Sequence, residues 1–499
     1  TRNTQTDQSP GGEMKLLGLL LTLVSFGLLS LPSALAQRNA NARNAPNIIL
    51  ILADDLGWGD LGSYGQTKIK TPHLDRLAAE GMRFTQFYSG SPVCAPSRCS
   101  LMTGKHGGHA YIRNNRETQP EGQWPIPASE VTIAELLKSR GYATGAFGKW
   151  GLGFVGTEGD PNKQGFDLFY GYNCQREAHN FYPDHLWRNS ERVELEGNTR
   201  GLTGEHYSHD LIEAEALRFI RDNKDRPFFA YVPFTIPHLA LQVPEDSLAE
   251  YVGKWDDPPY DGKNGYLPHP TPRAAYAAMI TRMDRSVGRI MALLKELKLD
   301  ASTLVIVSSD NGGAFGEVTK DFEFKPGRMG GTDYIFFGST GKFRAFKGSV
   351  YEGGIRVPFI ARWPGKIKSG TVSELPAVFY DVLPTLCEAA GVKPPSNTDG
   401  LSLLPTLTGR GRQARREFLL WEFGGYGGQQ AVRLGDWKGV RRNLHQGNLK
   451  IELYNLATDV GEQHDVAARR PQIVERIAEI MRREHTNSEA FPIKILDAR

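Results

Sequence analysis

The sequence predicts an α/β protein with a mostly parallel sheet flanked by helices, plus a smaller C-terminal subdomain of antiparallel strands. Two continuous apolar runs, residues 47–53 and 304–308, are typical of strands buried on both faces of a parallel sheet. Segments with helical periodicity separate such runs, and this alternation is the pattern of the α/β class. Both runs end in a pair of oxygen-bearing side chains, so we expect a functional site at the carboxyl ends of the strands.

The bulk composition limits the possible functions. The chain has 499 residues, of which 40% are hydrophobic, so it can bury a large core divided between a main domain and a smaller one. Its formal net charge of +3 is close to neutral for this length and argues against a nucleic-acid partner. Its four cysteines are too few for a disulfide scaffold.

Residues 14–36 have the layout of a signal peptide. One lysine precedes an apolar core over residues 16–31, and Ala34 and Ala36 form a small-x-small cleavage site. A membrane anchor is the alternative, but the apolar run is short against the roughly 20 residues that span a bilayer, and Pro32 ends it. We therefore expect a secreted or periplasmic protein without stable membrane insertion.

The first predicted strand, residues 47–53, is followed by a helix over residues 71–81. Thr71 is the expected N-cap, because threonine side chains often accept hydrogen bonds from the first free amides of a helix. Pro72 suits the first helical position, and Gly81 is the expected stop.

A second helix is expected to begin after Thr132 and to end at Gly141. Glu135 stands three residues after Thr132, which is the spacing of a capping box. The remaining main-domain elements are strands over residues 142–147, 228–232 and 304–308, and a long amphipathic helix over residues 276–297.

The pattern changes after about Pro376, where short strand candidates are separated by glycine-rich turns. These candidates cover residues 417–422, 430–434, 437–441 and 451–454, and an amphipathic helix is expected over residues 471–484. The expected organisation is a non-structural extension (1–13), a signal peptide (14–36), a linker (37–45), the main α/β domain (46–375) and a C-terminal subdomain of antiparallel sheet and helix (376–499).

Four oxygen-bearing side chains come directly after two predicted strands. Asp54 and Asp55 follow the first strand, and Asp310 and Asn311 follow the last strand of the main domain. Hard oxygen ligands without histidine or cysteine suit Ca²⁺ or Mg²⁺. One acidic pair could simply cap a helix or stay solvated, but two pairs at two strand ends favour a metal site.

Cys94 stands in the stretch Cys94-Ala-Pro-Ser-Arg98. As a plain thiol it could be a small buried hydrophobe, half of a disulfide or a thiolate nucleophile. Arg98 could lower its pKa, but no neighbouring residue in the sequence supplies a base. The full pattern is too unusual in composition to be expected by chance.

That pattern resembles the signature of the formylglycine-dependent sulfatases, and the resemblance extends over residues 46–485. The matching segments are NIILILADDLGWGDLGSYG (47–65), CAPSR with LMTG (94–104), GKWGLG (148–153), PHLA (237–240), SSDNGG (308–313), KGSVYEGGIRVPFIARWPGK (347–366) and ELYNLATDVGEQHDVA (452–467). The arylsulfatase A-like branch is the most similar part of that family.

The resemblance implies an alkaline-phosphatase-like fold and assigns roles to the residues above. Asp54, Asp55, Asp310 and Asn311 match ligands of one Ca²⁺ ion, which the modified residue 94 also touches. Three cations, Arg98, Lys149 and Lys347, would hold the sulfate and offset the charge that grows in the transition state. His238 would protonate the leaving alcohol, with Lys347 assisting.

The implied chemistry requires a formylglycine-generating enzyme that oxidises Cys94 to formylglycine (3-oxoalanine) before the chain folds. The hydrated aldehyde carries two hydroxyls on one carbon. One hydroxyl attacks sulfur and expels the alcohol, and the other, once deprotonated, collapses to the aldehyde and ejects sulfate. The implied substrates are sulfate esters of carbohydrates or aryl alcohols.

The chain departs from the family pattern at Gly151, where the family usually has the histidine that takes the proton from the second hydroxyl. His179 is one candidate replacement, and His109 is another; both are also candidate substrate-binding residues. Once Cys94 is converted, Cys99, Cys174 and Cys387 leave an odd number of thiols, so at least one is free in a monomer or bonded between chains.

Two alternatives to a sulfatase stay open. A phosphatase or phosphonate monoester hydrolase could use the same fold, although such enzymes typically have a Ser or Thr nucleophile and two metals. A non-catalytic protein that binds anionic glycans is the other alternative, and the departure at Gly151 is the observation that favours it.

Overall fold

The computed structural model describes residues 1–5, 45–263, 265–313 and 316–498, and it divides into a unit of residues 1–45 and a unit of residues 46–499. In the first unit, residues 1–5 are exposed and form neither helix nor strand. The expected signal peptide, residues 14–36, and nearly all of the expected linker lie outside the described residues. The second unit holds all helices and strands of the described part of the chain.

The large sheet of the second unit has ten strands among the described residues, in the order β15-β2-β14-β11-β1-β10-β6-β7-β8-β9. Its central strands are parallel: β1 (Asn47–Ala53) pairs with β10 (Phe228–Pro233) and β11 (Thr303–Ser309), and β6 (Ala143–Lys149) and β7 (Leu168–Tyr172) follow beyond β10. The outer strands are β2 (Met82–Phe84), β8 (His185–Arg188), β9 (Glu191–Glu194), β14 (Phe359–Arg362) and β15 (Thr371–Ser373). The structure therefore confirms a mostly parallel α/β sheet.

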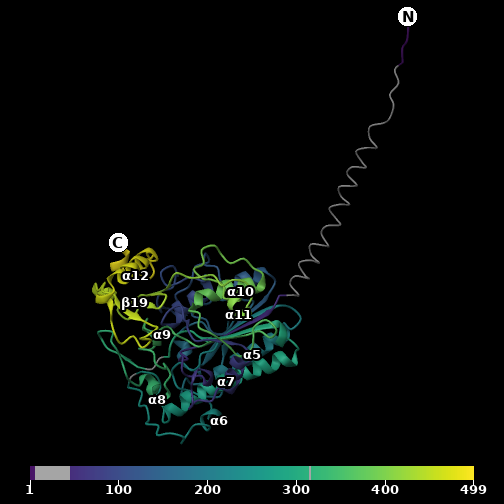
Figure 1. Cartoon of the computed structure of the whole chain (residues 1–499). Coiled ribbons are helices and arrows are strands. Elements are labelled where there is room, and N and C mark those ends of the chain that lie inside the picture. The colour runs from purple at the N-terminus through teal and green to yellow at the C-terminus, as the bar shows by residue number, and fades with distance from the viewer. Residues whose placement is uncertain (6–44, 264, 314–315, 499) are drawn as a thin grey trace. The chain divides into compact units, whose positions relative to one another are not determined.

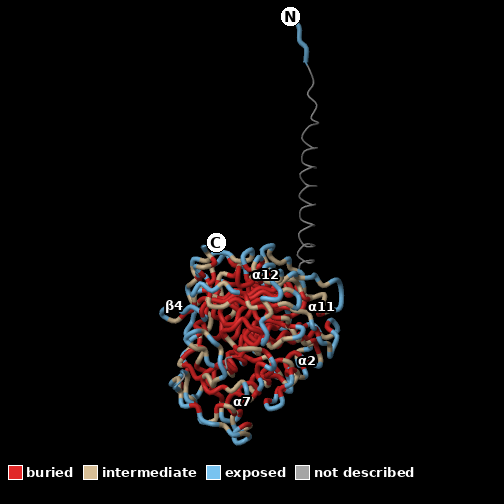
Figure 2. The backbone as a smooth tube through the Cα atoms, turned by 60° about the vertical axis from the view of Figure 1, so that its left-hand side comes forward, coloured by how far each residue is buried: buried red, intermediate tan, exposed pale blue. Residues whose placement is uncertain are grey.

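Helices cover both faces of this sheet (Figure 1). On one face, α2 (Pro72–Ala79), α5 (Ser208–Asp222) and α7 (Pro272–Glu296) pack their apolar side chains against Ile49, Ile51 and other core residues. Figure 1 shows α10 (Val382–Ala390) and α11 (Leu404–Thr408) on the other side from α5 and α7. Strands β1, β6, β10 and β11 are consequently buried along their whole length, in the red core of Figure 2.

The helix-end signals are partly confirmed. Thr132 and Glu135 form the expected capping box at the start of α4 (Ile133–Ser139). Thr71 occupies the N-cap position of α2, but its side chain does not cap the helix. Its Oγ1 instead accepts a hydrogen bond from the Gly62 amide and lies 3.2 Å from the Asp75 carboxylate, so a tertiary contact replaces the local one.

The C-terminal region contains the expected antiparallel sheet and final helix. Its strands are β17 (Leu419–Phe423), β18 (Gln429–Leu434), β19 (Trp437–Arg442) and β20 (Glu452–Asn455), in that order. The helix α12 (Pro471–Arg483) buries Ile477 and Ile480 in a cluster with Val432 and Leu453 of the sheet. Shorter strand pairs are β3 (Phe87–Tyr88) with β16 (Ala377–Val378), β4 (Glu117–Thr118) with β5 (Gly122–Gln123), and β12 (Glu317–Val318) with β13 (Phe324–Lys325).

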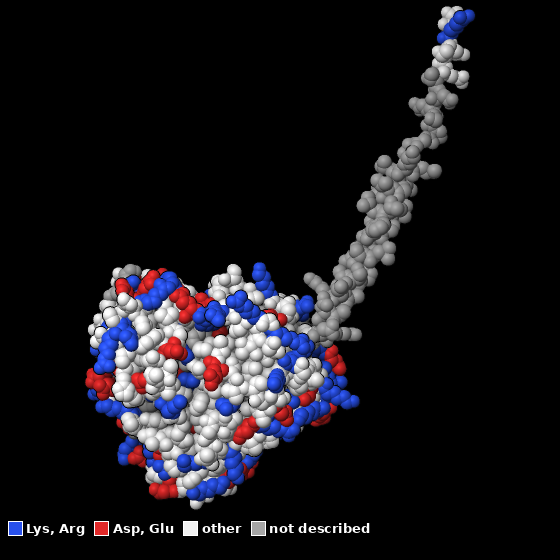
Figure 3. Space-filling view, viewed as in Figure 1, with Lys and Arg blue, Asp and Glu red and all other residues white. Residues whose placement is uncertain are grey.

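Two global features concern the surface charges and the helices of the described residues. On the face seen in Figure 3, basic and acidic side chains are interspersed rather than gathered by sign. Among the helices that the structure describes, none has the length and apolar character needed to cross a bilayer.

Candidate active site

The register of the central strands brings the two predicted oxygen pairs together. Ala53 of β1 pairs with Ser309 of β11, so the residues that follow them lie side by side. The Asp310 amide donates to the Ala53 carbonyl (3.0 Å), and the Asp55 amide donates to Asp310 Oδ1 (3.2 Å). Asp55 adopts a left-handed backbone (φ 64°), an uncommon conformation that turns the chain at this point. The strand ends therefore place their side chains in one buried site.

Two lysines neutralise the first acidic pair. Lys149 ends β6, and its Nζ lies 2.6 Å from Asp54 Oδ2. Lys347 approaches from the loop that precedes α9 (Glu352–Ile355), and its Nζ lies 2.8 Å from Asp55 Oδ2. Burial raises the pKa of Asp54, but the charges of Lys149 and its cationic neighbours outweigh this effect and hold that pKa below its ordinary value.

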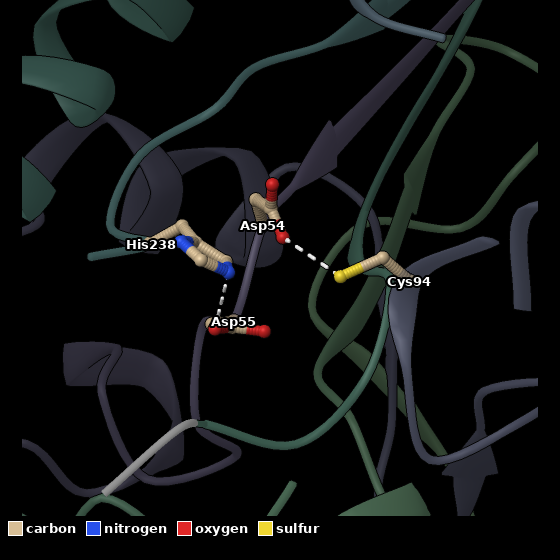
Figure 4. A group of neighbouring side chains, drawn as sticks. All are labelled: Asp54, Asp55, Cys94 and His238. Atoms are coloured by element: carbon tan, nitrogen blue, oxygen red, sulfur yellow. Dashed lines mark hydrogen bonds and ion pairs between the residues drawn. The ribbon is translucent and has the colours of Figure 1, made fainter. Parts of the chain in front are cut away.

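Cys94 lies between these two lysines at the first residue of α3 (Cys94–Thr103). Its Sγ is 3.5 Å from Lys149 Nζ, 3.4 Å from Lys347 Nζ and 3.7 Å from Asp54 Oδ1. Figure 4 shows the sulfur pointing toward Asp54, across from Asp55 and His238. Burial raises the pKa of the thiol to about 12, so unmodified Cys94 is a protonated, weak nucleophile at neutral pH.

Arg98 faces the same site because it lies one helical turn after Cys94. Its guanidinium is fully buried and donates to Asp310 Oδ2 at 2.8 and 3.2 Å, and to the Lys149 carbonyl at 2.5 Å. It therefore ties α3, β6 and the end of β11 to one another and adds a third positive charge beside Cys94.

Two histidines stack beside Asp55. The Nε2 of His238 lies 3.4 Å from Asp55 Oδ2, and its Nδ1 donates to the Leu239 carbonyl, which leaves Nε2 facing the site. The His179 ring stacks on the His238 ring, with centroids 4.4 Å apart and an interplanar angle of 13°. Burial lowers the pKa of both rings well below the ordinary value for histidine.

The donor set fits a hard divalent cation. Asp54, Asp55 and Asp310 crowd three carboxylates into one buried place, and burial together with the Asp54 charge raises the pKa of Asp310 to about 7. The Asn311 amide nitrogen donates to Asp55 Oδ1, while its Oδ1 is buried and has no partner among the described residues. An orphaned carbonyl-type oxygen beside three carboxylates is what an oxygen-preferring cation would satisfy.

The space beside Gly151, where the sequence indicated only a missing side chain, is occupied by another residue. A Cβ on Gly151 would lie 2.1 Å from Gln175 Nε2 and 3.8 Å from Arg98 Cδ, so the Gln175 amide fills the space of a side chain at this position. Both amide atoms of Gln175 are buried without a partner among the described residues. Sequence reasoning missed Gln175, because only the pairing of β6 with β7 brings the loops after them together.

His109 lies in another cluster. Its Nδ1 is 2.9 Å from Asp399 Oδ1, its ring stacks on His106 with centroids 4.2 Å apart, and its Nε2 lies 3.9 Å from a Glu484 oxygen. The structure gives it no contact with the residues around Cys94, so we leave it out of the proposed site. All four cysteines of the chain are buried and unpaired.

Comparisons with known proteins find sulfatases. A family model described as sulfatase matches residues 46–392, and one described as the C-terminal region of N-sulphoglucosamine sulphohydrolase matches residues 341–488. The chain is 36% identical to the N-acetylgalactosamine-6-sulfatase of Rattus norvegicus over 400 residues, which cover 76% of this chain and 69% of that protein. It is 33% identical to the arylsulfatase A of Homo sapiens over 506 residues, which cover 90% of each.

The fold comparison points the same way. The solved structure of Ps i-CgsB in complex with k-i-k-neocarrahexaose matches with a TM-score of 0.72 and 28% identity, covering 88% of this chain and 92% of that one. The family model spans well over half of the chain, and these two sulfatase relatives match it along most of their own length. The chain belongs to the sulfatase family.

Proposed function

We propose that this protein hydrolyses sulfate esters of carbohydrates or aryl alcohols, using a formylglycine made from Cys94 and one bound Ca²⁺ ion. The observation that carries the proposal is the position of Cys94 at the start of α3. Its Sγ lies 3.4 Å from the ammonium group of Lys347 and 3.5 Å from that of Lys149. A sulfate ester bound at this point meets three cationic side chains and the amide end of α3.

The side chains around residue 94 divide the work of binding and proton transfer. Lys149, Lys347 and Arg98 bind the sulfate oxygens and offset the charge that develops on them. Conversion of Cys94 would supply a hydrated aldehyde hydroxyl as the nucleophile, where the buried thiol is a weak one. His238 faces the site through Nε2, and because Nδ1 carries the proton of the neutral ring, it would protonate the leaving alcohol in its doubly protonated form, which the Asp55 carboxylate 3.4 Å away would stabilise.

Four residues would hold the cation: Asp54, Asp55, Asp310 and Asn311. The buried, partnerless Oδ1 of Asn311 and the crowding of three carboxylates support this assignment. When bound there, Ca²⁺ would supply positive charge against the sulfate oxygens and relieve the repulsion among the carboxylates.

His179 is the proposed acceptor of the proton that the family histidine would otherwise take. Its ring lies parallel to that of His238 at the same buried site, and residue 151 carries no side chain to do this work. The low pKa that burial gives His179 keeps the imidazole neutral, as a proton acceptor requires.

The proposed substrate class and location draw on the relatives and on the N-terminal sequence. The relatives are named for a sulfated amino sugar and for aryl sulfates, and one matching structure contains a neocarrahexaose. The sequence of residues 14–36 supports export to the periplasm or the medium. Maturation would depend on a formylglycine-generating enzyme as a partner that acts before the chain folds.

The test is the mass of the tryptic peptide 84–98, from protein made together with a formylglycine-generating enzyme. We expect the mass decrease that accompanies conversion of the thiol to an aldehyde, together with hydrolysis of an aryl sulfate that Cys94→Ala abolishes. Unmodified cysteine and no hydrolysis, in a host that converts a control sulfatase, would overturn the proposal and favour the glycan-binding alternative. Faster cleavage of phosphate or phosphonate esters than of sulfate esters would favour the other alternative.

A further inference from the structure

Two tyrosines beside the active site have backbones in the left-handed region. Tyr266 has φ 65° and Tyr426 has φ 46°, while Asp55 of the site itself has φ 64°. Bulky residues rarely adopt this conformation, and they keep it where the surrounding structure holds them, which is typical of ligand-binding sites. The fold therefore fixes both tyrosines in conformations that their own preferences do not explain.

Tyr266 contacts the two histidines. It lies between α6 (Glu245–Leu248) and α7, and its ring centroid is 5.7 Å from that of His179 and 6.2 Å from that of His238. Burial raises the pKa of its hydroxyl to about 12 even though the nearby charge of Lys347 lowers it. Tyr266 thus forms an aromatic wall against the group that is placed to protonate the leaving alcohol.

Tyr426 reaches the site from the turn between β17 and β18, a distant part of the sequence. Its ring lies against Gly348, the neighbour of Lys347, where an added Cβ would be only 2.9 Å from the ring carbon Cε2. Phe423 and Phe324 support it, with ring centroids 6.0 and 6.4 Å away. Although its neighbours hold it in place, 40% of Tyr426 remains exposed.

The hydroxyl groups of Tyr266 and Tyr426 have no hydrogen-bond partner in the described part of the fold. No hydrogen bond joins either hydroxyl to a described residue, whereas the buried Tyr64, Tyr88 and Tyr172 all have such partners. Tyrosines with one apolar face and one free hydroxyl are typical of surfaces that bind ligands.

We propose that Tyr266 and Tyr426 form the binding surface for the alcohol part of the substrate, contacting the face of its sugar or aryl ring. This inference rests on the proposed function. In the proposed function, His238 and Lys347 lie on either side of the ester oxygen that leaves with the alcohol. The Tyr266 ring contacts His238, and the Tyr426 ring lies against Gly348, next to Lys347. A ring attached to that oxygen therefore lies within reach of both aromatic faces, and aromatic faces favour flat or CH-rich surfaces.

The test compares Tyr266→Phe, Tyr266→Leu, Tyr426→Phe and Tyr426→Leu in fully converted enzyme, with an aryl sulfate and a sulfated saccharide. Leucine keeps bulk but removes the aromatic face, so we expect KM to rise by about 3- to 10-fold, from the usual worth of an aromatic contact. The phenylalanine variants keep the face and should stay close to wild type. Inhibition by inorganic sulfate should not change in any of them, since sulfate binds to the lysines and Arg98. Tyr111→Leu is the matched control, because Tyr111 is half-buried and makes no hydrogen bond or ring contact with the described site residues named here.

Leucine variants with wild-type KM for both substrates, at wild-type conversion of Cys94, would overturn the inference. A rise in KM together with an equal rise in the sulfate inhibition constant would also overturn it, because that result indicates general damage to the site. If wild-type protein neither converts Cys94 nor hydrolyses sulfate esters, the proposed function fails instead. Calorimetric titration of the desulfated saccharide into wild type and the leucine variants then still decides the role of the tyrosines.

Discussion

The side chain of Gln175 occupies the space that a side chain at residue 151 would need. A Cβ built on Gly151 would lie 2.1 Å from Gln175 Nε2, and the glycine itself has φ +78°. An amide from the loop after β7 thus fills the space beside the loop that follows β6.

Gly151→Ala should destabilise the protein through a steric clash as well as backbone strain. We expect a loss of about 1–3 kcal/mol in the free energy of unfolding from overpacking, added to the cost of the positive φ. Gly156→Ala is the matched control, because Gly156 has φ +87° with no atom within 4 Å of an added Cβ. Gln175→Ala should recover part of the difference between the two variants in urea unfolding. Equal losses for both alanine variants would contradict the clash.

The same pair of residues illustrates what the sequence could and could not predict. The apolar runs at residues 47–53 and 304–308 predicted both strands and the oxygen pairs that follow them, because a buried parallel strand has a strong local signature. The sheet order and the loop contacts depend on tertiary packing, so nothing local to Gly151 indicated Gln175. Thr71 failed as a cap because its Oγ1 accepts the Gly62 amide from another segment, while its hydroxyl donates to Asp75 of the same helix.

His179→Gln should slow turnover without preventing the first chemical step. If His179 accepts a proton only when sulfate is released, the variant should release about one alcohol per enzyme quickly and then turn over on the order of 100-fold more slowly than wild type. Stopped-flow measurement of alcohol release with an aryl sulfate shows both phases. His109→Gln should behave like wild type, because His109 pairs with Asp399 in another cluster. Full turnover and an unchanged pH profile in His179→Gln would contradict the role.

Calcium should stabilise the folded protein through Asn311 and the three carboxylates. A ligand that binds only the folded state adds about 2.7 kcal/mol at a concentration 100 times its Kd, so thermal unfolding should shift upward with added Ca²⁺ and downward with a chelator. Asn311→Leu removes the partnerless buried oxygen and should reduce this shift. Asp399→Asn, in the cluster around His109, is the control that should keep it. A shift of equal size in the Asn311 variant would contradict the assignment.

Asp284 should make stability depend on pH away from the active site. It is fully buried, its oxygens accept the amides of His73 and Leu74 at the start of α2, and burial raises its pKa to about 7. Because the folded pKa lies above the unfolded value, this group contributes most below about pH 4, and its contribution is lost as the pH rises to about 7. Asp284→Asn keeps one of the two acceptor oxygens and does not titrate, so its stability relative to that of wild type should rise between pH 5 and pH 8. Urea unfolding at the two values measures the gain, and a difference that does not change with pH would contradict the prediction.

We expect Lys438 to stabilise the contact between the C-terminal sheet and the segment that follows Lys347. Its Nζ lies 2.8 Å from Glu352 and 2.9 Å from Glu462, and all three side chains are fully buried. Lys438→Met leaves Glu462 without this cation and Glu352 with Arg356 alone, 3.0 Å away, and breaking a buried ion pair in this way typically costs about 3–5 kcal/mol. The double variant Lys438→Met with Glu462→Gln removes one of these charges and should recover part of the loss in urea unfolding. Lys450→Met, at an exposed lysine of the same region, should leave the free energy of unfolding unchanged. Glu352 begins the helix just after Lys347, so loss of its partner Lys438 should also disturb Lys347, and Lys438→Met should raise the KM for an aryl sulfate. An unaltered KM in the folded variant would show that Lys438, Glu352 and Glu462 support stability alone.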